Sequence, residues 1–197
     1  MTKHITKITS ICCYHLLRLK QVRRILSPEI VARIVSAYVI SRLDYCNSVL
    51  AGLPNASIMP LQRVQNAADR LIKLLGPRDH ISSTIRDLHW FSVKYRITYK
   101  LSLMMHAANN HRCPGYIAEL LTMTSSVISC SRLRSASSNR YEVPWNRPKC
   151  GDGAFSIAEP TAWNSRPKEI MDIPSTEFFK AQLKTYLYTL VYSNIYD

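Results

Sequence analysis

The sequence predicts a mainly α-helical protein, with a helical bundle first, then a loop-rich segment and a C-terminal helical segment. Only 5 of the 197 residues are Gly. Apolar residues recur every three or four positions through the first two thirds of the chain, as they do in amphipathic helices. Helix-breaking pairs, such as Gly52 with Pro54, separate these periodic stretches. Hydrophobic residues make up 47% of the chain, which is enough to build a packed core.

The first two predicted helices cover residues 9–26 and 27–52. Ser27 suits the N-cap of the second helix, and Pro28 suits its first position, where a missing N–H costs nothing. Gly52 and the proline that follows it are expected to end this helix. Its wide apolar stripe is predicted to consist of Ile30, Ile34 and Tyr38 with Val31, Val35 and Val39 beside them.

A third helix is predicted over residues 57–77, ended by Gly76 and Pro77. Its buried edge is predicted to contain Leu61, Val64, Ala68, Leu71 and Leu75. Shorter helices are expected from Ser83 to Leu88 and from Pro114–Gly115 through Leu121, with a longer one between them that starts after Ser92. The apolar face of that longer helix is expected to use Ile97, Leu101, Met104 and Ala108.

The composition changes at Thr122, where a serine-rich stretch with few large apolar residues predicts a loop or mobile linker to residue 139. Residues 140–145 suit a short strand, which allows a β-hairpin with the chain near Lys149. A helix broken by Pro160 is expected next. The last helix is predicted to start after Ser175 and to bury Phe179, Leu183, Tyr186 and Leu190. The predicted regions are therefore 1–121, 122–150 and 151–197.

The chain is strongly basic, with a formal net charge of +13 and a sequence pI near 9.7. The excess is spread widely: +6 in residues 1–50, +5 in 51–100 and +4 in 101–150, against −2 in 151–197. Such a domain attracts polyanions, so nucleic acid is the first candidate partner and an anionic membrane surface the second. A basic domain without any polyanionic partner is the plain alternative.

The sequence contains none of the motifs that would predict catalysis or a cofactor. Phosphate-binding loops, dinucleotide fingerprints and nucleophile elbows are missing, and the six cysteines include no C-x-x-C pair. Asp69, Asp79 and Asp87 each lie near an arginine, which favours ion pairing over metal binding. His89 and Trp90 are expected to pack in a small core. We therefore expect no catalytic residues, no metal and no cofactor.

The N-terminal residues and the cysteines indicate in which cellular compartment the protein is expected. The first twenty residues lack the apolar region of a secretory signal, and no uncharged stretch is long enough to cross a bilayer. Free thiols suit a reducing environment. We expect an intracellular location, in the nucleus or cytoplasm, and no membrane partner.

Three clusters of basic residues remain as candidate nucleic-acid contacts. They are Lys20, Arg23 and Arg24; Arg63, Arg70 and Lys73; and Arg96 with Lys100. Any one of them is explained equally well by a solvated helix face. Three clusters on neighbouring helices of a strongly basic chain predict contacts with phosphates.

An ordered set of motifs gives the chain a resemblance to a known family. SRLDYCNSVLAGLP (residues 41–54) is followed by LQRVQNAADRLI, HISSTIRDLHWFSVKYRITYKL, PGYIAELL, SRLRSAS, GDGAFSIAEPTAWNSRP and FFKAQLKTYL. The set resembles the thumb and C-terminal region of reverse transcriptases from LINE-type (non-LTR, jockey-like) retrotransposons, over residues 5–188. The chain departs from the family at Phe91–Ser92, where Leu-Pro is usual, and at Gly153, where Arg is usual.

The resemblance implies a thumb-like helical domain in residues 1–121, belonging to an RNA-directed DNA polymerase. It implies that the paired catalytic aspartates lie in a palm domain that would precede Met1. The chain alone is then expected to be non-catalytic and to contact the backbone of an RNA/DNA template–primer with little sequence readout. Asp44 and Arg42 are expected to fix helix packing.

Three other interpretations stay open. The chain is alternatively a host-recruited module that binds nucleic acid or protein, or a decayed remnant of a transposable element without function. The third is an enzyme whose site no motif reveals.

Overall fold

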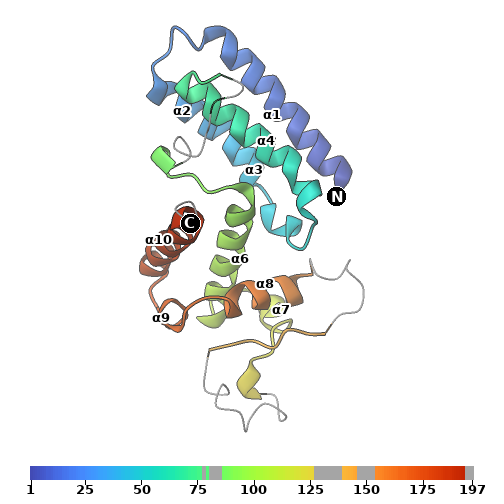
Figure 1. Ribbon diagram of the computed structural model, residues 1–197. Coiled ribbons are helices and arrows are strands. Elements are labelled where there is room, and N and C mark those ends of the chain that lie inside the picture. The colour runs from blue at the N-terminus through green and yellow to red at the C-terminus, as the bar shows by residue number, and fades with distance from the viewer. Residues whose placement is uncertain (77–78, 80–85, 127–138, 146–153, 194–197) are drawn as a thin grey trace. The chain divides into compact units, whose positions relative to one another are not determined.

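The structure, a computed structural model, describes residues 1–76, 79, 86–126, 139–145 and 154–193 (Figure 1). These residues are mainly α-helical, as predicted, and their one β pairing is an isolated antiparallel bridge between Met123 and Tyr141. The chain forms two compact units, Met1–Arg96 and Ile97–Asp197. The sequence placed its first boundary at residue 121, where the composition changes, whereas the compact units divide at Arg96.

In the first unit, α1 (Thr2–Val22) and α4 (Asn55–Lys73) run side by side (Figure 1). A third helical stretch packs against both of them. It consists of α2 (Pro28–Val35), a π-helical segment η1 (Ser36–Ile40) and α3 (Ser41–Asp44). The buried core between these helices contains Ile5, Cys12, Leu16, Leu19, Val31, Val35, Val39, Leu43, Leu61, Val64, Ala68 and Ile72.

The first predicted helix is confirmed, but with different ends. Helix α1 begins at Thr2 rather than residue 9 and ends at Val22 rather than residue 26. Its early start follows from packing, because Ile5 lies two turns before Cys12 on the same face and both are buried. Burial of this face outweighs the lower helix propensity of the β-branched residues around it.

The second predicted helix begins where the sequence predicted, but it ends before the predicted residue. The Ser27 side chain accepts a hydrogen bond from the Ile30 N–H at 3.5 Å, and Pro28 occupies the first turn. Regular helix ends at Asp44, because Cys46 adopts a left-handed backbone with φ of 53° and a 3₁₀ turn, η2 (Asn47–Leu50), follows. The predicted helix to Gly52 is therefore wrong.

The predicted apolar stripe of this helix is confirmed for one half only. Val31, Val35 and Val39 are buried, whereas Ile30 and Tyr38 are exposed. A stripe two residues wide was too broad, because of these six residues only the three valines are fully buried, while Ile34 is half-buried.

Helix α4 ends earlier than the Gly76–Pro77 signal predicted. Leu74 takes the left-handed conformation with φ of 55°, and the Leu75 N–H donates to the Arg70 carbonyl at 2.9 Å. This is the αL type of helix ending, in which a left-handed residue closes the last turn. Leu61, Val64 and Ala68 are buried as predicted, while Leu71 and Leu75 are half-buried. Gln65, Asp69 and Ile72 are buried on the same face, which the sequence did not predict.

The second unit contains most of α6 (Val93–Asn109), with α7 (Gly115–Ala118), α8 (Phe155–Asn164), α9 (Lys168–Met171) and α10 (Thr176–Ser193). Its core is built on aromatic contacts: the ring of His106 stacks on Phe179 at 4.1 Å, and Trp163 lies 5.9 Å from Phe179. The Trp163 indole N–H donates to the Asn139 carbonyl at 2.7 Å. Trp163 thus anchors a small core. His89, which was expected to pack in a small core beside Trp90, is exposed, and Trp90 is half-buried.

The helices α6, α7 and α10 start where the sequence predicted, directly after Ser92, Pro114 and Ser175. Of the apolar face predicted for α6, Ile97, Leu101 and Ala108 are buried, whereas Met104 is half-buried and Met105 takes the core position.

Three expectations for the second unit need correction. Helix α7 ends at Ala118 rather than Leu121. Helix α8 continues through Pro160 to Asn164, because one lost N–H is tolerated where Pro160 and Trp163 are both buried. Helix α10 buries Leu187, while Tyr186 is half-buried and Leu190 is exposed.

Some predictions fall on residues that the structure does not describe. These are the helix start at Ser83, most of the serine-rich loop and the pairing of a strand with Lys149. The bridge partner of Tyr141 within the described residues is Met123, at the beginning of the serine-rich stretch.

Candidate nucleic-acid interface

The eight predicted nucleic-acid contacts separate into three groups in the structure. Arg23 is buried and Arg96 is largely covered, whereas Arg70 and Lys73 already have partners at the surface. The third group is exposed and consists of Lys20, Arg24, Arg63 and Lys100. Lys100 lies in the second unit, and the other seven lie in the first.

Arg23 is a structural residue that holds the C-terminal end of α4. Its guanidinium donates to the carbonyl oxygens of Leu71 at 2.7 Å and Ile72 at 2.5 Å, and also to Leu26 at 2.8 Å. The last carbonyls of a helix have no partner within the helix and carry the negative end of its dipole. A cation placed there satisfies both needs, so Arg23 is not available to phosphates.

Arg96 also binds partners within the first unit. Its Nη1 lies 2.8 Å from Oδ2 of Asp44, its Nε donates to the Phe91 carbonyl at 2.9 Å, and its guanidinium lies 6.0 Å from the Trp90 ring centre. Only 12% of the Arg96 side chain is exposed. Asp44 thus links the end of α3 to the start of α6, which matches the packing role expected of it.

Arg70 and Lys73 are partly engaged. Arg70 Nη2 lies 3.5 Å from the Asp79 carbonyl, which is a weak hydrogen bond. Lys73 forms an ion pair of 3.2 Å with Asp87, in which both side chains are substantially exposed. Such exposed pairs are weak, so Arg70 keeps most of its capacity to bind an anion and Lys73 a part of it.

Lys20, Arg24 and Arg63 are exposed and make no hydrogen bond or ion pair with any residue that the structure describes. Lys20 and Arg24 lie on the last turns of α1 and its exit, and Arg63 lies two turns before Arg70 on α4. Arg70 is the fourth residue of this group. Because α1 and α4 pack together, Lys20, Arg24, Arg63 and Arg70 form a basic surface on the first unit.

The carboxylates of this unit do little to offset that surface. Residues 1–96 contain 15 Lys and Arg against 5 Asp and Glu, a formal net charge of +10. Asp69 is buried, and burial raises the pKa of its carboxyl to about 7. Asp44 and Asp87 are paired with Arg96 and Lys73. The unit therefore presents a net positive potential to a polyanion.

A groove of about 970 Å³ lies between the C-terminal halves of α1 and α4. Its apolar lining comes from Leu16, Leu17, Ala67, Leu71, Leu74 and Leu75. Lys20, Arg24 and Arg70 contribute the charged part, and no carboxylate lines it. This groove was not predicted from the sequence, where its one signal is a pair of leucines, Leu17 and Leu74, that fall outside the periodic buried stripes.

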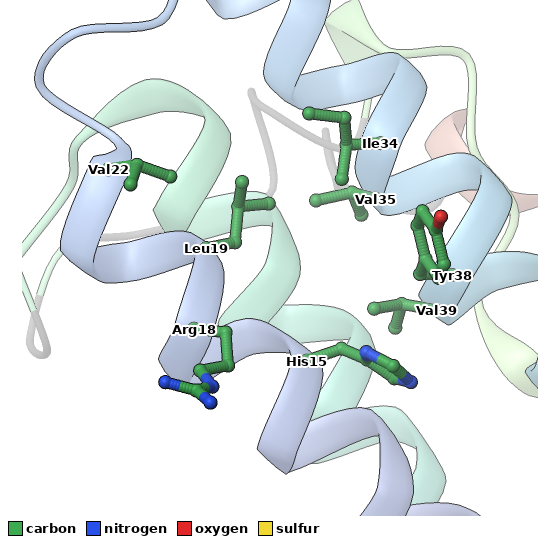
Figure 2. Close-up of a pocket in the computed structure, with 8 residues that line it drawn as sticks. All are labelled: His15, Arg18, Leu19, Val22, Ile34, Val35, Tyr38 and Val39. Carbon is green, nitrogen blue, oxygen red and sulfur yellow. The ribbon is translucent and has the colours of Figure 1, made fainter.

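A smaller pocket of about 250 Å³ lies on another side of α1, against α2 and the π-helical segment (Figure 2). Figure 2 shows the rings of His15 and Tyr38 at one end, and their centres are 5.4 Å apart. The remaining lining is mostly aliphatic. Arg18 donates to the Tyr14 hydroxyl at 3.3 Å. The pocket brings together no nucleophile and base, so it suggests no catalytic chemistry.

The described residues also bring together no set of three or more His, Cys, Asp or Glu side chains able to hold a metal ion. The thiol of Cys12 is buried, and its pKa is raised to about 11 by that burial, so it stays protonated and unreactive. Of the helices in the described part of the chain, none has the length and apolar character needed to cross a bilayer.

Comparison with protein-family models, curated proteins and solved structures finds no match to this chain.

Proposed function

We propose that this chain is a non-catalytic nucleic-acid-binding module whose first unit contacts the sugar–phosphate backbone of a template–primer. This is the role that a thumb region has in LINE-type reverse transcriptases, which the sequence resembles. The observation that carries the proposal is the surface formed by Lys20, Arg24, Arg63 and Arg70 on two helices packed side by side. None of the four ion-pairs with a carboxylate among the described residues.

Backbone contact fits the chemistry of this surface better than base readout does. Long cationic side chains bind phosphates without regard to sequence, whereas base readout needs a helix or strand shaped to enter a groove with polar tips. Each phosphate that a cation neutralises releases counterions, and four such contacts would give a log–log salt slope of about 3 to 4.

The proposal includes no polymerase activity for this chain alone. Phosphoryl transfer by two metal ions requires carboxylates that hold the ions about 4 Å apart. The part of the chain that the structure describes offers no such set. The lack of activity stays a prediction, and measurable primer extension by the purified chain would contradict it.

The experiment that tests the proposal is binding of the full chain to RNA–DNA hybrids of unrelated sequence over a range of salt concentrations. The affinity should fall steeply with salt and should differ little between the sequences. Binding that is indifferent to salt, or that depends strongly on one sequence, would contradict backbone contact.

A second candidate function is that of a host-recruited protein-binding module. It is favoured by the apolar lining of the groove between α1 and α4, which phosphate contact does not explain.

A further inference from the structure

The groove between α1 and α4 exposes more apolar surface than a phosphate-binding site needs. Leu17 is 65% exposed and Leu74 is 62% exposed, and they line the groove from α1 and α4 respectively. Leaving two large aliphatic side chains in water is unfavourable. Exposed apolar surface with a polar rim is typical of a site where a partner docks.

The shape of the groove limits what that partner can be. Its walls are two helices that run in the same direction, since Arg23 at the end of α1 reaches the end of α4. The lining on α1 runs from Cys13 to Arg24, which spans about 16 Å at the α-helical rise per residue. A partner helix of about three turns has that length, and its apolar stripe would lie along the leucines.

The charges around the groove define the chemistry of the partner. Lys20 and Arg24 stand on one wall and Arg70 on the other, and the lining contains no Asp or Glu. A helix with acidic residues on both sides of its apolar stripe would place carboxylates next to cations on both walls. Such complementarity speeds association and selects against basic partners.

We infer that the groove between α1 and α4 binds an amphipathic helix of an acidic protein partner, with the partner's apolar stripe on Leu17 and Leu74. A second copy of this chain is a poor occupant, because a unit with a net charge of +10 repels another. A single-stranded nucleic acid would need aromatic side chains on which bases stack, and the lining has none. A membrane surface is flat, whereas this site is concave.

The test uses two synthetic peptides of 18 residues with leucines spaced three and four apart. One peptide carries Glu beside the leucine stripe, and the other carries Lys at the same positions. Binding to the full chain is followed by fluorescence anisotropy. The acidic peptide should bind at least about tenfold more tightly than the basic one. Equal binding of the two peptides, or no binding of either, would overturn the inference.

A pair of matched variants locates the peptide. Leu17→Asn with Leu74→Asn should weaken binding of the acidic peptide by about tenfold or more. The control, Ile25→Asn with Val49→Asn, makes the same kind of change at two exposed residues outside the groove and should alter binding less than about twofold. Both variants change exposed side chains, so the fold is retained. If the control weakened binding as much as the leucine variant, the groove would not be the site.

A cysteine in the groove gives an independent measurement. Cys13 is exposed and lines the groove, whereas Cys46 is exposed after α3 and outside it. The acidic peptide should slow alkylation of Cys13 by iodoacetamide and leave Cys46 unchanged. If anionic vesicles protected Cys13 as well as the peptide does, the groove would belong to a membrane surface and the inference would be wrong.

Failure of this inference is distinguishable from failure of the proposed nucleic-acid function. The leucine variant removes apolar contacts and changes no charge, so backbone binding should remain close to that of the unchanged chain. Loss of peptide binding with retained nucleic-acid binding would show two separate uses of one unit.

Discussion

The guanidinium of Arg23 donates a hydrogen bond to the backbone carbonyl of Ile72 at 2.5 Å, which ties the end of α1 to the end of α4. The same side chain satisfies the Leu71 carbonyl and is 4% exposed. Arg24, the next residue, is exposed and lines the groove. Adjacent arginines therefore have different roles, one in stability and one at the candidate interface.

Replacing Arg23 should destabilise the protein. Arg23→Gln removes charge-assisted hydrogen bonds to carbonyls that then stay buried, and we expect a loss of about 2 kcal/mol or more in the free energy of unfolding. Arg24→Gln is the matched control and should change the unfolding free energy by less than about 0.5 kcal/mol. Urea unfolding measures both. If the two variants were equally stable, the role of Arg23 in capping α4 would be wrong.

Asp69 should make the stability of the first unit depend on pH. Burial raises the folded-state pKa of Asp69 from 3.8 to about 7, against the opposing effects of Arg96 and Arg70. The folded state then holds a proton that the unfolded state loses, so this contribution is complete below about pH 4 and is lost as pH rises to 7. Asp69→Asn should be more stabilising at pH 8 than at pH 5.

The measurement for Asp69 is thermal unfolding of both proteins at several pH values. The difference in melting temperature between Asp69→Asn and the unchanged chain should grow between pH 4 and 7 and level off above. A difference independent of pH would show that Asp69 is ionised in the folded protein.

Glu159 offers a similar test in the second unit. It is 2% exposed, one of its carboxyl oxygens has no hydrogen-bond partner, and burial raises its pKa from 4.5 to about 8. The stability that this group contributes is therefore complete below about pH 4.5 and is lost as pH rises through 8. The stabilisation of the chain by Glu159→Gln should therefore be larger at pH 9 than at pH 5. Unfolding followed by circular dichroism measures this difference. Destabilisation by this change at pH 9 would indicate a charged partner for Glu159.

The starts of α2, α6 and α10 could be predicted from local sequence because caps and breakers act within a few residues, whereas α1 begins at Thr2 rather than at residue 9. Ser27 with Pro28, Ser92 and Ser175 all precede helices at the predicted places. The ends of α3 and α4 could not be predicted in this way. Cys46 and Leu74 take left-handed backbones that their residue types do not favour, so tertiary packing sets these conformations.

The basic residues of the candidate site show the same limit. The position of a residue on a helix indicates on which face its side chain lies, and Arg63 lies opposite the predicted buried edge of α4 and is exposed. It does not show which carbonyls or carboxylates come within reach after folding. Arg23 and Arg96 were predicted as phosphate contacts but are held by Ile72 and Asp44. Only the packing of separate helices reveals such partners.

The salt dependence of binding to an RNA–DNA hybrid is the sharpest test of backbone contact by the basic surface on α1 and α4. The interface variant changes four residues to Gln: Lys20, Arg24, Arg63 and Arg70. The control removes the same charge from the same unit by changing Lys3, Lys7, Arg18 and Arg33 to Gln; all four are exposed. Both proteins should keep their helical circular dichroism, since only exposed or partly exposed side chains change.

If the four cations of the interface each neutralise a phosphate, the log–log salt slope should fall by about 3 to 4 in the interface variant. In the control it should fall by less than about 1. Equal slopes in the two variants would contradict backbone contact by the basic surface, because binding would then reflect the net charge of the unit and not a surface formed by α1 and α4.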